Sequence, residues 1–414
     1  MRESITGEGK QSRATYEALE EVVREKVQAF IQDILEEEIR EFLGRGKSER
    51  IRGIDTPRGY RNGYGKPRKF SLTNGTVTIK RPRIRGKERC ESKVLPLFKR
   101  RSKEVGELLP ELYIHGLANG DFELAMRGLL GEGAPLSGAS IQRLKAKWQA
   151  EYDTWKKQDL SGLHVVYQWA DGIYVKAGLE KDKAALLVIV GALKSGEKKI
   201  LACESGYRES KESWLGVLRD LIGRGLKLGR LTIADGHLGI WSALGEIHPE
   251  GKEQRCWNHK ITNILDTLPK RLRAEAGEYL REIPYAETQE ECEKRRDQFV
   301  SRYGRDYPKA AGKLLMDWER MVTFYAFPKE HWIHLRTTNV VESPFSSVRL
   351  RTDAAKRFKK VEHAAAMIWK LLQVAEKNFR TLKGYWLLPD VYAGRQCIDG
   401  VMKTLPNGSG RKAA

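Results

Sequence analysis

The chain has 414 residues, 40% of them hydrophobic, with 75 Lys and Arg against 55 Asp and Glu and a formal net charge of +20. This length allows two or three domains with a large buried core, whereas no apolar run is long enough to span a bilayer and the N-terminus lacks the apolar core of a signal peptide. We therefore expect a soluble intracellular protein whose basic charge favours nucleic acid as a partner over an anionic membrane surface.

The first predicted element is a helix over residues 13–44. Apolar side chains recur at three-to-four spacing from Leu19 to Phe42, and Gly44 and Gly46 end the pattern. Such a stripe is typical both of a helix that packs on its own domain and of a helix that pairs with a second copy, and the stripe alone does not name its partner. We assign residues 1–50 to an N-terminal helical region with possible dimerisation.

Residues 51–102 predict a basic β-hairpin. Residues 58–89 contain eleven Lys or Arg and one acid, Glu88, and two alternating runs flank an Asn74-Gly75 turn. A basic hairpin with nearby tyrosines suits a phosphate backbone, although a solvated basic surface has the same composition. The residues that we expect to contact DNA here are Arg61, Tyr64, Arg68, Lys69, Arg81 and Arg83.

Residues 103–160 predict short helices. Asp121 is a candidate N-cap, the segment 131–135 is a turn, and Ser140–Trp148 forms a second helix with a basic face. The pattern is compatible with a helix-turn-helix DNA reader that uses Arg143 and Lys145, although many helical hairpins bind nothing.

From residue 161 the order of predicted strands and helices is that of an α/β domain. Strands at 165–170, 184–190 and 199–203, a helix at 214–226, a strand at 231–234 and a further helix from Gly239 follow one another. This β-β-β-α-β-α order fits the mixed sheet of ribonuclease-H-like folds. We expect the catalytic domain to cover 161–382 with a helical insertion at about 262–332, and the tail 383–414 to be irregular, with 407–414 disordered.

Three acids stand out in this domain. Asp171 and Asp235 each precede a glycine at or just past the apolar part of a strand, and Glu342 lies among polar residues and arginines. Three carboxylates are sufficient to hold two Mg²⁺ ions against a phosphodiester, with Mn²⁺ as a substitute. Each acid has a plainer interpretation, because Asp-Gly is a common turn dipeptide and Asn339 with Glu342 fits a helix capping box.

A second cluster contains Cys256 and His259, three residues apart. A Cys-x-x-His pair is half a zinc site, and His331 with His334 has the spacing of another half, but buried or hydrogen-bonded side chains near the active site are the more common outcome, so zinc is not expected. The five cysteines are scattered and do not form a disulfide framework. His237 would position water or phosphate near Asp235, or cap the helix that follows.

In these motifs the chain resembles the Mutator-type transposases of bacterial insertion sequences, part of the class that uses an Asp-Asp-Glu metal triad. The resemblance covers most of the chain and rests on several motifs in family order: Gly59-Tyr-Arg61-Asn-Gly-Tyr64, Gly75-Thr-Val77 with Pro82-Arg83, Asp171 with Tyr174-Val-Lys176, Asp235-Gly-His237, Gln254-Arg-Cys256-Trp-Asn-His259, Phe324-Tyr with Pro328, and Arg336-Thr-Thr-Asn-Val-Val-Glu342-Ser.

The resemblance implies a triad of Asp171, Asp235 and Glu342, with the Cys-x-x-His signature at Cys256 and His259. It also implies a ribonuclease-H-like catalytic domain with an α-helical insertion, preceded by regions that recognise inverted repeats. The chain departs from many relatives at Gly172 and Gly236, which should alter local backbone freedom more than metal binding.

The expected function is that of a DNA transposase that binds terminal inverted repeats and performs metal-dependent strand cleavage and strand transfer. The alternatives are a transposase-derived DNA-binding protein and a structure-specific nuclease. We expect double-stranded DNA as partner, a homodimer or larger homo-oligomer on DNA, no membrane, and a cytoplasmic, nucleoid-associated location in bacteria. Near the triad we expect active-site support from His237, Cys256, His259 and Asn339 and phosphate contacts from Arg336, Arg349 and Arg351, extended by Lys356, Arg357, Lys359 and Lys360.

Overall fold

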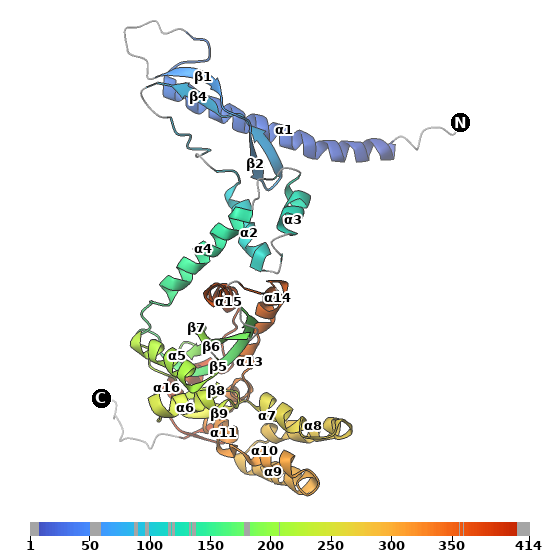
Figure 1. The fold of residues 1–414 in the computed structure, drawn as a ribbon, viewed down its shortest axis with the longest axis vertical. Coiled ribbons are helices and arrows are strands. Elements are labelled where there is room, and N and C mark those ends of the chain that lie inside the picture. The colour runs from blue at the N-terminus through green and yellow to red at the C-terminus, as the bar shows by residue number, and fades with distance from the viewer. Residues whose placement is uncertain are drawn as a thin grey trace, which may run out of the picture. The chain divides into compact units, whose positions relative to one another are not determined.

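The computed structural model divides into two compact units, Met1–Leu144 and Lys145–Ala414, with the boundary inside helix α4 (Gly138–Trp155) (Figure 1). The structure describes residues 8–49, 59–86, 90–95, 99–114, 117, 121–131, 134, 138–177, 183–206, 208–355, 357–358 and 360–403. No helix within these ranges is both long and apolar enough to cross a membrane.

The first unit begins with the long helix α1 (Glu8–Leu43), followed by four short strands. β1 (Tyr60–Tyr64) pairs antiparallel with β4 (Pro82–Arg85), and the predicted hairpin is confirmed as β2 (Arg68–Leu72) and β3 (Gly75–Ile79), with Phe70 opposite Val77. The C-terminal half of α1 packs on this hairpin through a small core: Leu35, Val77, Ile79 and Leu95, with Ile31, Phe70 and Leu72 against it.

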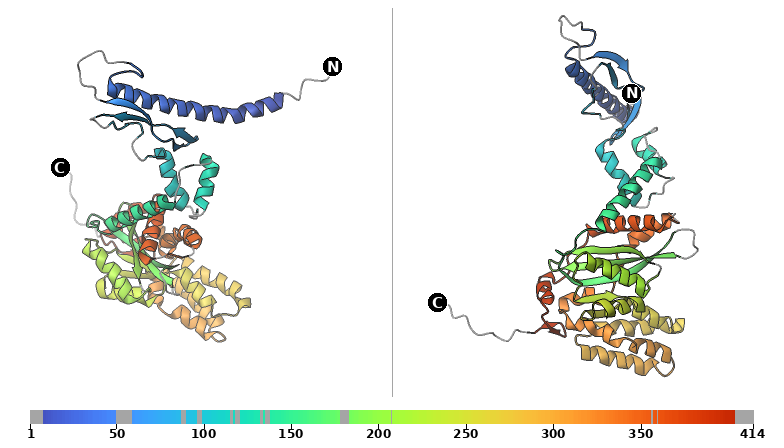
Figure 2. Two further views of the ribbon diagram at one scale, coloured as in Figure 1. Left: turned by 45° about the horizontal axis from the view of Figure 1, so that its top comes forward. Right: turned by 60° about the vertical axis from the view of Figure 1, so that its left-hand side comes forward.

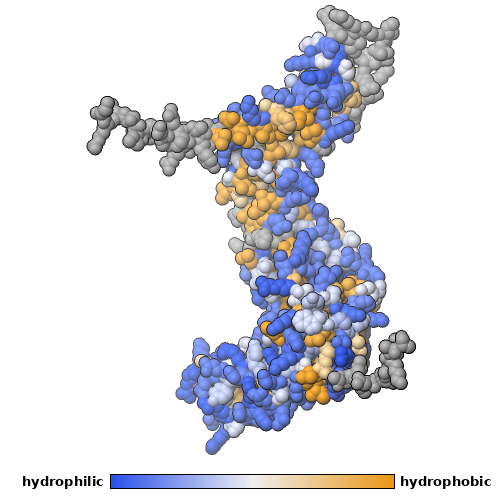
Figure 3. All heavy atoms as spheres, turned by 180° about the vertical axis from the view of Figure 1, so that it is seen from behind, coloured by the Kyte–Doolittle hydropathy of each residue, from blue (hydrophilic) through white to orange (hydrophobic). Residues whose placement is uncertain are grey.

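Burial changes along α1. Leu35 is 1% exposed, whereas Leu19, Val22 and Phe30 are 55%, 47% and 65% exposed. Figure 3 shows apolar side chains gathered on the part of α1 that adjoins its grey N-terminal turns. The helix therefore packs on its own unit from about Ile31 onward, and dimerisation through this helix stays a prediction.

Three helices complete the first unit and enter the second. α2 (Lys103–Ile114) and α3 (Asp121–Leu130) precede α4, so the predicted short helices are confirmed. Asp121, the predicted N-cap, is the first residue of α3. Most of the predicted turn at 131–135 lies outside the described residues, so the structure does not test a helix-turn-helix geometry.

The second unit contains a mixed five-stranded sheet with the order β7-β6-β5-β8-β9. β5 (Val165–Lys176), β6 (Lys183–Leu193) and β7 (Lys198–Gly206) are antiparallel, whereas β8 (Leu231–Ala234) and β9 (Lys252–Arg255) run parallel to β5. The helices α5 (Lys211–Gly223) and α6 (Leu238–Ile247) share a buried apolar cluster with the sheet. The predicted β-β-β-α-β-α order is confirmed, and β9 is an additional strand.

β9 is absent from the sequence-based prediction because its residues, Lys-Glu-Gln-Arg, carry no apolar signal. Gln254 is nevertheless fully buried, since its amide donates to the Met321 carbonyl (3.0 Å) and its Oε1 accepts from the Phe324 N–H (2.8 Å). These bonds satisfy the buried amide and tie the strand to the helical region that follows.

The segment predicted as a helical insertion is helical, and its helices begin slightly earlier, at residue 257. Its helices are α7 (Trp257–Leu265), α8 (Arg273–Glu282), α9 (Gln289–Tyr303), α10 (Pro308–Leu315), α11 (Trp318–Val322) and α12 (Trp332–Leu335), with short 3-10 turns η1 (Lys270–Leu272), η2 (Ile283–Tyr285), η3 (Thr323–Ala326) and η4 (Lys329–His331) between them. Within this unit the insertion helices, yellow to orange, gather on one side of the sheet and the C-terminal helices, red, on another (Figures 1 and 2).

After the insertion the chain returns to the sheet. The four-residue helix α13 (Asn339–Glu342) packs against β5 and β6, and it is followed by α14 (Phe345–Ala355) and by α15 (Val361–Glu376), which packs on β7.

The prediction of an irregular tail from residue 383 is wrong for residues 385–402. The 3-10 turn η5 (Tyr385–Leu387), the helix α16 (Leu388–Tyr392) and the strand pair β10 (Cys397–Ile398) and β11 (Val401–Met402) are ordered elements. Leu388, Val391 and Cys397 are buried, so isolated apolar residues without a period anchor this segment. The predicted disordered end, 407–414, lies outside the described residues.

Candidate active site

Two of the predicted acids lie side by side because of strand register. In the parallel pairing Ala170 of β5 stands opposite Ala234 of β8, and Ala234 stands opposite Arg255 of β9. The next residue on each strand is therefore Asp171, Asp235 or Cys256, and neighbouring strands lie about 4.7–4.9 Å apart. Asp171 within β5 and the residues that follow β8 and β9 thus present two carboxylates and a thiol in one row.

The turn interpretation of Asp171-Gly172 is wrong, because both residues lie inside β5, where Asp171 pairs with Val188. A Cβ atom at Gly172 would lie 2.6 Å from Glu209 Oε1, and one at Gly236 would overlap the Arg255 guanidinium. A side chain at either position would therefore have to displace the neighbouring Glu209 or Arg255 side chain. The expectation that they act through backbone freedom has no support here, since neither has a positive φ.

Glu342 is the last residue of α13, whose N-cap is Thr338 rather than Asn339. The capping-box interpretation is consequently wrong, and the Glu342 carboxylate instead accepts a hydrogen bond from the Thr338 hydroxyl. Asn339 is exposed and its Oδ1 accepts from Asn258 Nδ2 at 3.2 Å, which joins α13 to α7.

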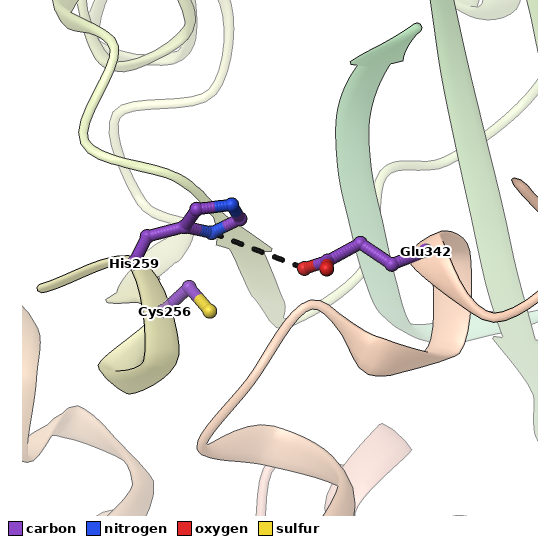
Figure 4. A group of neighbouring side chains, drawn as sticks. All are labelled: Cys256, His259 and Glu342. Atoms are coloured by element: carbon purple, nitrogen blue, oxygen red, sulfur yellow. Dashed lines mark ion pairs between the residues drawn. The ribbon is translucent and has the colours of Figure 1, made fainter. Parts of the chain in front are cut away.

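His259 lies between two of the predicted acids. Its Nδ1 is 3.8 Å from Asp235 Oδ1 and 3.9 Å from Glu342 Oε1. Figure 4 shows His259 and Cys256 projecting from the start of α7 toward Glu342. The ligand atoms of these three residues lie within 4.8 Å of one another, the one such group found among the described residues. The structure therefore brings the acids and the Cys-x-x-His pair to one place.

The site has an unusual charge balance. Burial raises the pKa of Asp171 to about 7, and the negative charges of Glu209 and Glu342 add to this while the Gly172 N–H and His259 oppose it. A hydrogen bond with Cys256 raises the pKa of His259 to about 9 against the effect of burial, helped by Asp235 and Glu342. At neutral pH a protonated His259 therefore neutralises part of the charge of the acids.

The two half-sites for zinc do not combine. His331 is fully buried, with Nδ1 2.7 Å from the Tyr167 hydroxyl and Nε2 2.9 Å from the Gly384 carbonyl, and His334 Nε2 accepts from the Lys383 N–H at 3.1 Å. Both rings are thus used in packing. All five cysteines are free thiols, in agreement with the absence of a disulfide framework in the sequence.

Two residues near the acids were not identified from the sequence. Thr338 is completely buried among Cys256, His259 and Glu342, and Glu209 lies against Gly172 with its charge acting on Asp171. Glu209 precedes Ser210, the N-cap of α5, whose side chain accepts from the Ser213 N–H. The sequence signal is weak in both cases, because acids near helix starts and threonines at helix caps are common.

His237 is exposed at the N-cap of α6 and makes no side-chain cap bond there. The predicted DNA-contacting residues divide by exposure. Exposed side chains are Tyr64, Lys69, Arg83, Arg143, Lys145, Arg349, Arg357 and Lys360; half-buried ones are Arg61, Arg68, Arg81 and Arg336; Arg351 is buried. Lys356 and Lys359 lie outside the described residues.

Three of the arginines serve the fold in this structure. Arg61 pairs with Glu36 of α1 and lies near the Tyr64 ring. The Arg336 guanidinium lies 4.6 Å from the Tyr285 ring centre, and it also contacts the rings of Phe324 and Trp332. Arg351 is only 3% exposed. None of the three presents its charge freely to solvent, because each is used in packing or pairing.

Comparison with known proteins gives consistent results. The sequence model described as Transposase, Mutator family, matches residues 2–381. The transposase of insertion sequence IS6120 from Mycolicibacterium smegmatis is 43% identical over 290 residues, covering 70% of this chain and 90% of the relative. That of IST2 from Acidithiobacillus ferrooxidans is 40% identical over 283 residues, covering 68% and 96%.

A more distant relative, the transposase of ISRM5 from Rhizobium meliloti, is 27% identical over 375 residues, covering 89% of this chain and 91% of the relative. Among solved structures, a chain of the Drosophila P element transposase strand transfer complex aligns with a TM-score of 0.29 and 12% identity, covering 68% of this chain and 83% of that chain. A likeness this low supports no argument about the fold.

Proposed function

This chain belongs to the Mutator family of transposases, and we propose that it binds the terminal inverted repeats of an insertion sequence and cuts and joins DNA strands there. Asp171, Asp235 and Glu342 form the catalytic triad. The observation that carries this assignment is the strand register, which sets Asp171 beside Asp235. Glu342 joins them, because its Oε1 lies 3.9 Å from His259 Nδ1, the same atom that lies 3.8 Å from Asp235 Oδ1.

The donor set fits divalent magnesium, with manganese as a substitute. Carboxylate oxygens are the ligands that these hard cations prefer, and a few acids suffice because magnesium retains several waters. Asp171, Asp235 and Glu342 would hold the ions. When bound, such ions polarise a phosphoryl oxygen and lower the pKa of water, which is the chemistry that a phosphodiester substitution needs. Zinc held jointly by the Cys256–His259 pair and the His331–His334 pair has no support, because His331 and His334 are engaged elsewhere.

The proposed reaction has two steps. In the first, water attacks the phosphorus at the element's end, the P–O3′ bond breaks, and a 3′-hydroxyl and a 5′-phosphate are released. In the second, this 3′-hydroxyl attacks a target phosphodiester and displaces its 3′-oxygen, so that one phosphodiester replaces another. The triad side chains orient these groups, and His259 balances charge between Asp235 and Glu342.

The architecture supports this assignment in two further respects. Three antiparallel strands followed by two parallel ones, in the order β7-β6-β5-β8-β9, are compatible with a ribonuclease-H-like core that carries α7–α12 as an insertion. The net charge of +20 and the exposed basic residues of the first unit suit a phosphate backbone. Two DNA ends must be joined in one complex, which favours at least a dimer.

The test is cleavage and joining of labelled duplexes that carry the element's own terminal repeats, with Mg²⁺ and with EDTA, by the wild type and by Asp171→Asn. We expect nicked and joined products only from the wild type with Mg²⁺, and equal DNA binding by both proteins. Repeat-specific binding without any cut product in Mg²⁺ or Mn²⁺ would favour a DNA-binding protein. Cut products that are never joined would favour a nuclease.

A further inference from the structure

We propose that Thr338 is a positioning residue for Glu342, and that Cys256 in turn holds Thr338. The inference rests on the proposed function, since it concerns how the third acid of the triad is kept in place. It gives the Cys-x-x-His pair a supporting role through hydrogen bonds, without a metal of its own.

The Thr338 hydroxyl lies at the centre of the cluster. The side chain is 0% exposed, and its Oγ1 donates to Glu342 Oε1 while lying 3.2 Å from Cys256 Sγ and 3.4 Å from His259 Nδ1. A hydroxyl has one hydrogen to donate and two lone pairs with which to accept. The arrangement that satisfies all partners directs the hydroxyl hydrogen at the carboxylate, while His259 Nδ1–H and Cys256 S–H donate to the two lone pairs of Oγ1.

The backbone of Thr338 is held as well. Its N–H donates to Cys256 Sγ at 3.3 Å, and the neighbouring Trp257 N–H donates to the Arg336 carbonyl at 2.9 Å. Cys256 is itself fixed to the sheet, because its N–H donates to the Ala234 carbonyl at 2.9 Å. Ala234 precedes Asp235. A continuous series of hydrogen bonds therefore links Glu342 to the end of β8, which Asp235 follows.

Glu342 needs such a support more than the two aspartates do. It stands on a helix of only four residues, and a glutamate has more rotatable bonds to immobilise than an aspartate. A buried hydroxyl directed at one carboxylate oxygen removes much of that freedom. Outer partners of this kind are worth about 10- to 100-fold in metal affinity or activity at metal sites.

The test compares three variants of the full-length protein. Thr338→Val keeps the branched shape but removes the hydroxyl, and Thr338→Ser keeps the hydroxyl. Thr337→Val makes the same chemical change at the adjacent threonine, whose Oγ1 accepts a long hydrogen bond from the Asn339 N–H (3.5 Å). Mn²⁺ binding is measured by electron paramagnetic resonance without DNA, beside wild type and Asp171→Asn, and cleavage is measured against Mg²⁺ concentration. Thermal denaturation verifies that each variant folds.

We expect Thr338→Val to weaken Mn²⁺ binding by about 10- to 100-fold and to raise the Mg²⁺ concentration required for cleavage, with DNA affinity unchanged. Thr338→Ser and Thr337→Val should match the wild type. Thr338→Val with wild-type metal dependence would overturn the inference while leaving the triad intact. If the wild type itself bound no Mn²⁺, or if Asp171→Asn bound it equally well, the proposed function would fail instead.

Two further measurements keep the inference testable in every case. Crystal structures of Thr338→Val and Thr337→Val report the Glu342 carboxylate directly, and an unmoved Glu342 in Thr338→Val would contradict its role. Zn²⁺ titration addresses the other interpretation of Cys256, His259 and Glu342. Tight binding of one Zn²⁺ that is lost in both Cys256→Ser and Glu342→Gln would replace the hydrogen-bond role by a soft-metal site.

Discussion

Asp171 and Glu342 reach the site on supports of different kinds. Asp171 stands within the twelve-residue strand β5, with backbone pairing to β6 and, up to the preceding residue, to β8. Glu342 ends a four-residue helix that returns from a long helical insertion, and its position is defined by side-chain hydrogen bonds around Thr338. One acid is placed by a backbone ladder and the other by a few polar side chains.

The two supports should tolerate different substitutions. A backbone ladder holds its residues whatever their side chains are, so substitutions beside Asp171 act mainly through space. A side-chain network fails when one member is removed, because a buried polar group is then left unsatisfied. The sheet side should therefore be sensitive to added volume, and the helical side to lost polar groups and to buried charge.

The largest effect is expected at Glu342 itself. Glu342→Gln keeps the shape and the contact with Thr338 but removes the charge, and we expect cleavage to fall by at least about 10³-fold, about 4 kcal/mol of barrier, with DNA binding unchanged. Glu362→Gln, at an exposed position at the start of α15, is the matched control and should match the wild type. Full Mg²⁺-dependent cleavage by Glu342→Gln would refute the triad assignment.

The next effect is expected on the helical side, at Lys260 of α7. Its side chain is 1% exposed, its ammonium donates to the Met316 carbonyl, and burial lowers its pKa to about 8, with Arg255 adding to the shift. Between about pH 8 and 10.5 the unfolded chain binds a proton that the folded chain has released. Stability should therefore rise with pH across this window, by an amount on the order of 3 kcal/mol.

Lys260→Met should remove this rise, which urea denaturation at a series of pH values from 7 to 10.5 measures. Lys309→Met, at an exposed lysine of α10, is the control and should keep the wild-type slope. If the free energy of unfolding changed equally with pH in wild type and Lys260→Met, the buried charge of Lys260 would not destabilise the fold. The helical side would then not be more sensitive to buried charge than the sheet side.

The smallest effect is expected on the sheet side, at Gly172. A Cβ there would lie 2.6 Å from Glu209 Oε1, so Gly172→Ala should cost about 1–3 kcal/mol of stability through overpacking and shift Glu209 away from Asp171. Adding Glu209→Ala should restore the stability. At Gly239 the Cβ would overlap the Glu209 backbone carbonyl, so Gly239→Ala should not be rescued in the same way. Unfolding free energies of Gly172→Ala and Gly239→Ala, each with and without Glu209→Ala, decide between these outcomes.

Much of the fold followed from local patterns. Apolar runs and turn residues predicted the hairpin at β2 and β3, the order of strands and helices along the chain from β5 to α6, and β8 at its observed bounds of Leu231–Ala234. β9 was missed because Gln254 and Arg255 are buried through hydrogen bonds and ion pairing, which leave no apolar signal. The ordered segment after residue 385 was missed because single apolar anchors have no period.

The candidate site shows the same limit. The sequence identified the three acids by their places at or just past the apolar part of a strand and in a polar, arginine-rich segment. It did not identify the residues that join them. Thr338 and Cys256 are 82 residues apart in sequence, and no local pattern relates residues so distant. Likewise, sequence could not show that Arg336 lies among aromatic rings or that Arg351 is buried, since an arginine in a basic segment has the same appearance whether it faces solvent or the core.

The sequence by itself determined the charge of the molecule, its alternation of strands and helices, and which carboxylates follow the apolar runs of strands, because these properties depend on neighbouring residues. Only the tertiary structure decided that Asp171 and Asp235 lie on neighbouring strands at the same level, and that Glu342 and Asp235 both lie near His259. It also decided that Glu209 lies against Gly172 and that Thr338 donates to Glu342. These relations arise from strand register and from a helical insertion that returns the chain to the sheet, and both are set by packing between segments far apart in the sequence.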